Sequence, residues 1–287
     1  MTGTRPPHVA VLDSGAGGLT IVRSIRQRLP DVMLTYVADA AGCPYGERDA
    51  DDVIRRVSRL ARLVDRARQP DILVIACNTA STVVLPLLRA RLKIPVVGVV
   101  PAIKTAARLT RNQCIGLLAT PATIARPYVD ALHQEFAPDC RLVRVGSSEL
   151  VGMAERWLWQ RECPATDRLE RILALFVESG VDTVVLGCTH FPLLAPVIGA
   201  VLGESVTLVD SGDAVARRVE SLLGHIRRAD SQAPHQSEAW VTQSQPLPVS
   251  EALCLGFARE GFPVTRSLLF GPQTETTRNA SRFLPQA

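Results

Sequence analysis

The sequence has no long apolar run and almost no excess of charge of one sign. Its longest apolar stretches, such as Ile72–Cys77 and Pro95–Ile103, fall far short of the roughly 20 residues needed to cross a bilayer. Lys and Arg total 32 against 28 Asp and Glu, so the formal net charge is only +4. The sequence therefore favours neither a membrane nor a nucleic acid as a partner.

The cysteines lack the patterns that mark disulfide frameworks and zinc sites. There are seven, an odd number, no two form C-x-x-C, and none has a histidine at zinc-finger spacing. The first residues contain neither an apolar leader core nor a small-residue cleavage site. We therefore expect a cytoplasmic protein with free thiols and no metal site.

What the chain does contain is enough apolar sequence for one large or two modest domains: 287 residues, 47% of them hydrophobic. Short β-branched runs alternate with helical patterns, which is typical of parallel βαβ units and predicts an α/β protein of two doubly wound lobes. The expected strands are Val9–Leu12, Leu34–Val37, Ile72–Ala76, Val96–Val99, Ile115–Ala119, Leu142–Val145, Thr183–Leu186 and Val206–Val209. The expected helices are Thr20–Arg28, Ala50–Arg66, Thr79–Leu92, Ala122–Glu135, Ser148–Trp159, Asp167–Glu178 and Asp213–Leu223.

Two turns are candidates for the crossings between the lobes: the proline-rich stretch Pro95–Pro101 and the segment Val209–Gly212. Residues 225–248 are polar and rich in Gln and Ser, which predicts a loop or connector. A last strand, helix and strand are expected within Ala239–Phe270. Residues 273–287 are expected to form a frayed tail.

One short sequence pattern occurs once in each half of the chain. Asp71 and Asp182 each lie six residues before a cysteine, with an apolar strand between them and a polar pair after it. Cys77 and Cys188 thus follow strands, where a helix N-terminus can lower a thiol pKa from about 8.5 toward neutrality. A single cysteine in such a place is more often a small core residue. The repetition favours a pair of chemically active thiols.

The first strand ends in Asp13-Ser14-Gly15-Ala16-Gly17-Gly18, whose glycines allow a ligand to approach the backbone. This is neither G-x-G-x-x-G nor a phosphate-binding loop, so nucleotide binding is not supported. Asp13 is either a proton-handling group or a turn residue, and His190 is either a partner of Cys188 or a structural histidine. Glu155 lies in an expected helix, where a charged residue is by default predicted to be on the solvent-exposed face. The other histidines are interpreted as surface residues: His8, His133, His225 and His235.

Four sequence motifs follow one another along the chain: Leu12-Asp-Ser-Gly-Ala-Gly-Gly-Leu19, Pro44-Tyr-Gly46, Ala76-Cys-Asn-Thr-Ala80 and Leu186-Gly-Cys-Thr-His-Phe-Pro-Leu193. Together they give the chain a close resemblance to the glutamate racemases of the cofactor-independent aspartate/glutamate racemase superfamily. The resemblance runs from about Val9 to Leu223, although the segment 38–43 departs from the Gly-Asp-Thr-Ala-Arg sequence of the family.

The resemblance implies a set of site residues. Its catalytic cysteines fall on Cys77 and Cys188, and we pair Asp13 with the first and His190 with the second. Glu155 matches the third assisting group by position. The substrate-binding residues implied are Asp13, Ser14, Tyr45, Gly46, Asn78, Thr79, Thr120, Thr189 and His190.

The resemblance also implies two facing lobes with an active-site cleft between them, residues 1–98 plus 209–287 and residues 99–208. The implied activity is interconversion of L- and D-glutamate without cofactor or metal, which supplies D-glutamate for peptidoglycan. Inversion at an α carbon needs proton transfer on both faces, which two opposed thiols can perform. The alternatives are a racemase for aspartate or another amino acid, a decarboxylase or cis–trans isomerase of the same fold, and a non-catalytic amino-acid-binding protein. The expected partner is a small molecule, and the chain could form a homodimer.

Overall fold

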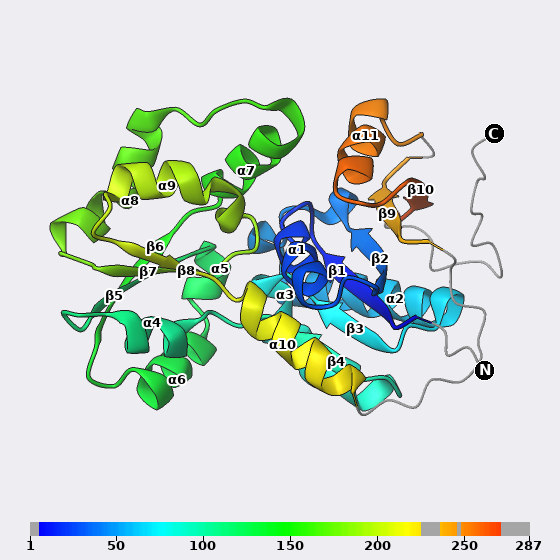
Figure 1. Cartoon of the computed structure of the whole chain (residues 1–287), viewed down its shortest axis with the longest axis horizontal. Coiled ribbons are helices and arrows are strands. Elements are labelled where there is room, and N and C mark those ends of the chain that lie inside the picture. Colours follow the sequence, from blue (N-terminus) through cyan, green and yellow to red (C-terminus); the bar gives the residue numbers. More distant parts are fainter. Residues whose placement is uncertain (1–5, 225–235, 246–247, 271–287) are drawn as a thin grey trace.

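The structure is a computed structural model that describes residues 6–224, 236–245 and 248–270. These residues form two lobes, each built on one parallel sheet (Figure 1), which confirms the predicted fold class. The first sheet has the strand order β10-β9-β2-β1-β3-β4 and the second the order β6-β5-β7-β8. The strands are β1 (His8–Asp13), β2 (Met33–Ala38), β3 (Ile72–Ile75), β4 (Val96–Gly98), β5 (Cys114–Ala119), β6 (Arg141–Gly146), β7 (Thr183–Leu186), β8 (Thr207–Val209), β9 (Glu238–Gln243) and β10 (Val264–Leu269).

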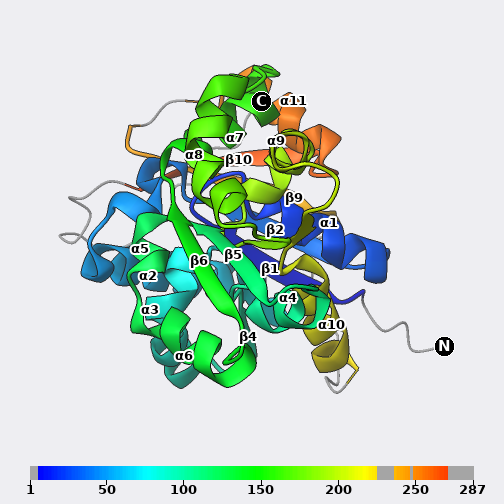
Figure 2. The same ribbon diagram turned by 90° about the vertical axis from the view of Figure 1, so that its left-hand side faces the viewer.

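Helices cover both faces of each sheet, as expected for parallel strands that are buried on two sides. In the second lobe, α4 and α6 lie on one side of the strands and α7, α8 and α9 on the other (Figure 2). The α-helices are α1 (Leu19–Arg28), α2 (Ala50–Arg68), α3 (Asn78–Arg91), α4 (Ile103–Leu109), α5 (Pro121–Ile124), α6 (Pro127–Phe136), α7 (Glu149–Gln160), α8 (Thr166–Glu178), α9 (Ala195–Leu202), α10 (Gly212–Leu223) and α11 (Glu251–Arg259). The 3-10 helices are η1 (Ala40–Gly42), η2 (Tyr45–Glu47) and η3 (Phe191–Leu194).

Strand β1 shows why the central strands read as continuous apolar runs. Val9 and Val11 pack in the core on one side of the sheet, with residues of α1 and α10. Ala10 and Leu12 pack in the core on the other side, with α2 and α3. Because successive side chains point to opposite faces, a strand covered on both sides needs apolar residues at every position.

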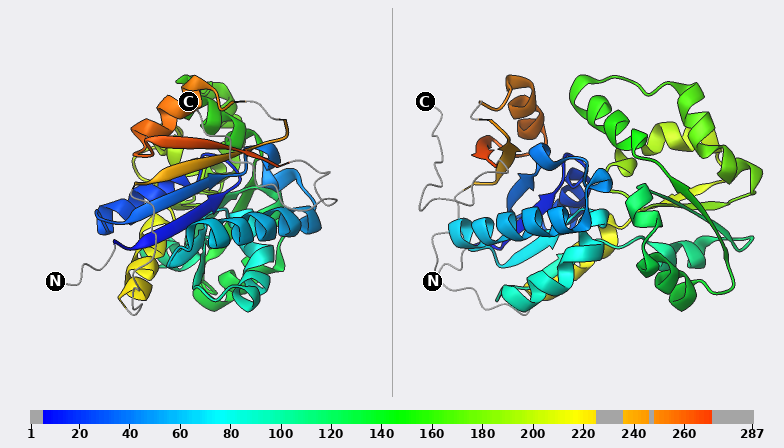
Figure 3. Two further views of the ribbon diagram at one scale, coloured as in Figure 1. Left: turned by 90° about the vertical axis from the view of Figure 1, so that its right-hand side faces the viewer. Right: turned by 180° about the vertical axis from the view of Figure 1, so that it is seen from behind.

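The C-terminal segment returns to the first lobe. β9 pairs in parallel with β2, and β10 pairs with β9 (Figure 3). Composition predicts a connector over residues 225–248, but strand β9 starts within this range. The segment forms a strand because pairing on both of its edges buries Ala239 and Val241. The expected last strand, helix and strand are present as β9, α11 and β10. Residues 225–235 and the expected tail 273–287 lie outside the described residues.

Three local expectations differ from the structure. The helix expected over Ala122–Glu135 is divided into α5 and α6, because Arg126 before Pro127 has the extended conformation that a following proline favours. Helices α4 and α9 are not predicted from the sequence. His8 is not on the surface: its side chain is fully buried and its Nε2 lies 2.9 Å from Thr35 Oγ1.

The other histidines interpreted as surface residues have mixed outcomes. His133 is half-buried, and its Nε2 lies 2.7 Å from the carbonyl of Cys140. His225 and His235 lie outside the described residues. Among the helices that the structure describes, none is long and apolar enough to cross a membrane.

Candidate active site

The sequence motifs collect at the carboxyl ends of the strands. Asp13 is the last residue of β1, and Cys77 follows the neighbouring strand β3 as the N-cap of α3. Cys188 follows β7 of the second lobe. In open parallel sheets this edge is where ligands bind.

The two cysteine motifs meet at one small cavity between the lobes. Asn78, next to Cys77, lines it from the first lobe, and Cys188 and Thr189 line it from the second. The cavity volume is about 10 Å³, so the lobes are closed on each other at this point. The two sulfurs are close enough for the charge of Cys188 to raise the pKa of Cys77.

Asp13 links the two lobes. Its Oδ2 accepts the backbone N–H groups of Gly15 at 3.2 Å and Gly18 at 3.0 Å, and its Oδ1 accepts the hydroxyl of Thr189 at 3.3 Å. The carboxyl is fully buried. Burial raises the pKa of Asp13 above its usual value, although the positive charge of His190 and the two N–H groups oppose the increase. Asp13 is therefore a carboxyl that takes up a proton more readily than one in water.

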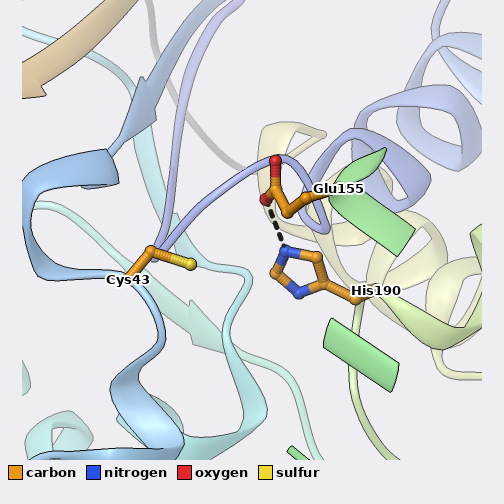
Figure 4. A group of neighbouring side chains, drawn as sticks. All are labelled: Cys43, Glu155 and His190. Atoms are coloured by element: carbon orange, nitrogen blue, oxygen red, sulfur yellow. Dashed lines mark hydrogen bonds and ion pairs between the residues drawn. The ribbon is translucent and has the colours of Figure 1, made fainter. Parts of the chain in front are cut away.

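His190 and Glu155 form a pair beside Cys188, with the histidine buried and the glutamate partly exposed. His190 Nε2 lies 2.8 Å from Glu155 Oε1, and its Nδ1 lies 3.9 Å from the sulfur of Cys188 (Figure 4 shows the histidine and the glutamate). Burial works to lower the pKa of His190, but the hydrogen bonds and charges of Cys188 and Glu155 raise it well above its usual value. The raised pKa favours the imidazolium form, which donates from Nε2 to Glu155 and points Nδ1–H at the sulfur. The backbone nitrogen of Gly17 lies 3.2 Å from the same Nε2 atom.

Glu155 is held by both lobes. Its Oε1 also accepts the N–H of Ala16 at 2.7 Å, and its Oε2 accepts the indole N–H of Trp159 at 2.7 Å. Burial works to raise the pKa of Glu155, but these bonds and the charge of His190 keep it below its usual value. The prediction that Glu155 lies on a solvent-exposed helix face is therefore wrong, because the glycine turn of the first lobe covers its carboxylate.

The surroundings of Cys77 favour its neutral thiol form. Burial raises its pKa well above the usual value and the charge of Asp13 adds to this, while the N–H of Ala80 and the hydroxyl of Ser14 oppose the increase. The lowering expected from the helix N-terminus is wrong for Cys77, because desolvation of a thiolate outweighs the helix dipole when the sulfur is buried.

The remaining predicted residues lie in two groups. Thr79 Oγ1 lies 3.0 Å from Thr120 Oγ1 across the lobe boundary, and a methyl group on Gly46 would lie 3.0 Å from Thr120 Cβ. The buried Tyr45 donates its hydroxyl to Asp39 at 2.6 Å. Asn78 Oδ1 is buried and has no hydrogen-bond partner among the described residues.

Sequence reasoning missed Asp39 and Cys43. Asp39 is fully buried and accepts two hydrogen bonds from Arg56, each at 2.7 Å, and one from Thr242 at 2.5 Å. Its position after β2, at the same sheet edge as Asp13, is a signal that could have found it. Cys43 is half-buried near His190 and Glu155, and burial raises its pKa to about 12.

A larger groove of about 770 Å³ lies elsewhere, over α2 of the first lobe. Its lining includes neither Cys77 nor Cys188. The lining arginines are Arg48, Arg55, Arg56, Arg59, Arg62 and Arg91.

Comparison with known proteins identifies the family. The family model described as Asp/Glu/Hydantoin racemase matches residues 19–219. The chain belongs to this racemase family. Within it, the chain is 46% identical to the glutamate racemase of Shewanella loihica over 252 residues, which cover 88% of this chain and 91% of the relative. It is 50% identical to the glutamate racemase of Pectobacterium atrosepticum over 222 residues, 77% of this chain and 78% of the relative.

Solved structures of the racemase family have the same fold. The crystal structure of Escherichia coli glutamate racemase, in complex with L-glutamate and the activator UDP-MurNAc-ala, superposes with a TM-score of 0.86 at 43% identity. The match covers 92% of this chain and 99% of that chain. The glutamate racemase isoform RacE1 of Bacillus anthracis superposes with a TM-score of 0.74 at 29% identity, covering 90% and 96%.

Proposed function

We propose that the protein is a glutamate racemase, an isomerase that interconverts L- and D-glutamate by moving the α proton between the two faces of the carbon. The observation that carries the proposal is the meeting of the two cysteine motifs at one interlobe cavity, lined by Asn78 from one side and by Cys188 and Thr189 from the other. The identity to glutamate racemases over most of the chain supports glutamate as the substrate. D-Glutamate made in this way supplies peptidoglycan synthesis.

Each cysteine has a different partner, which supports a division of roles. Cys188 lies beside the ring of His190, so we assign it the base that takes a proton from the substrate. Cys77 is a neutral thiol and can give its proton to the opposite face. One thiol and one thiolate exist before and after the transfer, so the roles reverse for the other enantiomer.

The assisting groups keep this exchange in balance. We assign Asp13 to Cys77, because its charge acts on that sulfur, and the His190–Glu155 pair to Cys188. The imidazolium form of His190 stabilises negative charge on the Cys188 sulfur before that sulfur takes the substrate proton. Preorganised donors and charges of this kind can contribute several kcal/mol by stabilising the developing carbanion.

The surrounding polar groups are suited to bind an amino acid. We assign the substrate carboxylate to backbone N–H groups and to the hydroxyls of Ser14, Thr79 and Thr189. The buried Asn78 Oδ1, which has no partner among the described residues, can accept a hydrogen bond from the substrate ammonium group. The hydroxyl of Tyr45 is held by Asp39, so we expect Tyr45 to act through its backbone.

The test is racemisation of L- and D-glutamate in D2O by the wild type and by Cys77→Ser and Cys188→Ser. Each variant should lose racemisation by about 10²–10⁴-fold, because a positioned acid or base is removed. The exposed Cys163 provides the matched control, since Cys163→Ser should keep wild-type turnover. Near-normal racemisation by Cys77→Ser would refute the two-base assignment.

The same assay with L-aspartate separates the nearest alternative. The two substrates differ by one methylene, a difference worth about 1–3 kcal/mol in a pocket. Faster turnover of aspartate than of glutamate would contradict the proposed substrate.

Three further assignments belong to this proposal. We propose that residues 1–98 plus 209–287 form one domain and residues 99–208 the other, which is supported by the separate sheets of the two lobes. We also propose a cytoplasmic location and a homodimer. Light scattering of the purified protein tests the dimer, and a monomer mass at all concentrations would exclude it.

A further inference from the structure

Three side chains of different donor type converge beside the glycine turn of the first lobe. The ligand atoms of Cys43, Glu155 and His190 all lie within 4.8 Å of one another (Figure 4). A methyl group placed on Gly15 would lie 2.4 Å from Glu155 Oε1 and 3.1 Å from both Cys43 Sγ and His190 Nε2. The three atoms therefore surround a common point.

We propose that Cys43, Glu155 and His190 form a binding site for a soft divalent cation such as Zn²⁺, and that the bound ion inhibits the enzyme. Neither the two-base reaction nor the family similarity uses Cys43. The expectation of no metal site rested on spacing along the chain, whereas these ligands come from the loop after η1, from α7 and from the loop after β7.

The donor set and its geometry fit zinc. Zinc takes thiolate, imidazole and carboxylate ligands at about 2.0–2.3 Å, so neighbouring ligand atoms in a tetrahedral site are roughly 3.5 Å apart. The Glu155–His190 pair is already at 2.8 Å, and the remaining separations are at most 4.8 Å. Shifts on the order of 1 Å would complete three ligands and leave a fourth position for water. The soft thiolate favours Zn²⁺ over Mg²⁺.

Backbone N–H groups of the glycine turn point at two of the ligand atoms: that of Gly17 lies 3.2 Å from His190 Nε2, and that of Ala16 lies 2.7 Å from Glu155 Oε1. Binding of an ion therefore requires the Gly17 N–H to move away from the histidine. Trp159 donates to the other carboxylate oxygen of Glu155, which is the kind of outer contact that orients metal ligands. The Glu155 side chain is 26% exposed and Cys43 is half-buried, so an ion can reach the site from solvent. Coordination releases the thiol proton of Cys43 and the Nε2 proton of His190 to solvent.

Inhibition follows from two consequences of binding, and this part rests on the proposed function. The cation takes the His190 nitrogen that now donates to Glu155, so the pair can no longer exchange a proton with Cys188. It also joins a ligand of the first lobe to two ligands of the second lobe. The tie holds the lobes closed over a cavity of only about 10 Å³.

The first arm of the test is inhibition of racemisation by ZnCl2 for the wild type, Cys43→Ala and Cys163→Ala. Loss of a ligand should raise the half-inhibitory Zn²⁺ concentration roughly tenfold or more in Cys43→Ala, and Cys163→Ala should behave as wild type. Metal-free turnover of Cys43→Ala should be unchanged, which also shows that it folds. MgCl2 should not inhibit. Equal Zn²⁺ sensitivity of Cys43→Ala and wild type would overturn the proposal, since the ion would then act elsewhere, for example on the catalytic thiols.

The second arm measures binding without any activity. Co²⁺ is titrated into the Cys77→Ser/Cys188→Ser double variant, and a thiolate-to-cobalt charge-transfer band is expected. The band should disappear when Cys43→Ala is added to the double variant. Absence of the band in the double variant would overturn the site whether or not the protein is a racemase, so the two proposals can fail separately.

Discussion

Replacing Gly17 with alanine should push apart the two lobes at the candidate site. A Cβ at this position would lie 2.5 Å from His190 Nδ1, 2.7 Å from the His190 backbone nitrogen and 2.7 Å from Thr189 Oγ1. Side-chain atoms can rotate away, but a backbone nitrogen cannot. The segment that carries Cys188, Thr189 and His190 therefore has to move.

The size of the effect follows from that distance. The backbone nitrogen must move by roughly 0.7 Å to reach the 3.4 Å at which ordinary contact begins. A misplacement of about 1 Å at a reacting group costs about 10²-fold in rate. We therefore expect Gly17→Ala to lower kcat/KM for glutamate by between roughly 10-fold and 10²-fold, with a smaller loss of stability of about 1–3 kcal/mol from overpacking.

The assay follows racemisation of L- and D-glutamate by polarimetry and the free energy of unfolding in urea. Gly199 in α9 is the matched control, because a Cβ there would make an ordinary contact of 3.8 Å with Leu208. Gly199→Ala should keep full activity and gain up to about 1 kcal/mol of stability. If Gly17→Ala had wild-type kcat/KM and stability, the lobes would not approach as described and the argument for a closed site would be wrong.

Two other substitutions test the charges around the site. Glu155→Gln removes a group that raises the pKa of His190, so that pKa should fall. The raised pKa of His190 stabilises the folded state fully below about pH 6.5, and this stabilisation is lost as the pH rises through the higher folded-state pKa. Urea unfolding at a series of pH values should therefore show the loss of stability at lower pH in the variant than in the wild type. An unchanged profile would contradict the His190–Glu155 pair. Asp39→Asn leaves Arg56 without its buried partner and should cost about 3–5 kcal/mol in urea unfolding. Asp213→Asn, on an exposed carboxylate that is 64% accessible, should cost less than about 1 kcal/mol, and equal losses would contradict this ranking.

The sequence predicts the cysteines better than it predicts their surroundings. Cys77 and Cys188 are identified by a local pattern, because a strand end followed by a helix places a side chain at the ligand-binding edge whatever lies opposite. The pKa of Cys77 is not predicted, because it depends on burial by distant segments. The same limit applies to Glu155: a helix pattern cannot show that a turn 139 residues away covers its carboxylate.

Asp39 and His8 illustrate the second limit. The bond between Thr242 and Asp39 joins residues 203 positions apart, and it exists because β9 adds to the edge of β2. Composition predicts a connector in that region, since a strand needs no special composition once its neighbours bury it. His8 looks like a polar residue before a strand, but the pairing of β1 on both edges places it in the interior.

The return of β9 and β10 to the first sheet has a consequence for biosynthesis. The strands of the second lobe lie in one continuous stretch of the sequence, so this lobe can fold while the rest of the chain is still being translated. The first lobe can complete its sheet only after almost the whole chain has been synthesised. Until Glu238–Gln243 is available, β2 is an unpaired sheet edge. A message truncated before this segment would yield a polypeptide that contains Cys77 and Cys188 but no Thr242 to hold Asp39. Such a product would be a target for aggregation and proteolysis rather than a smaller enzyme.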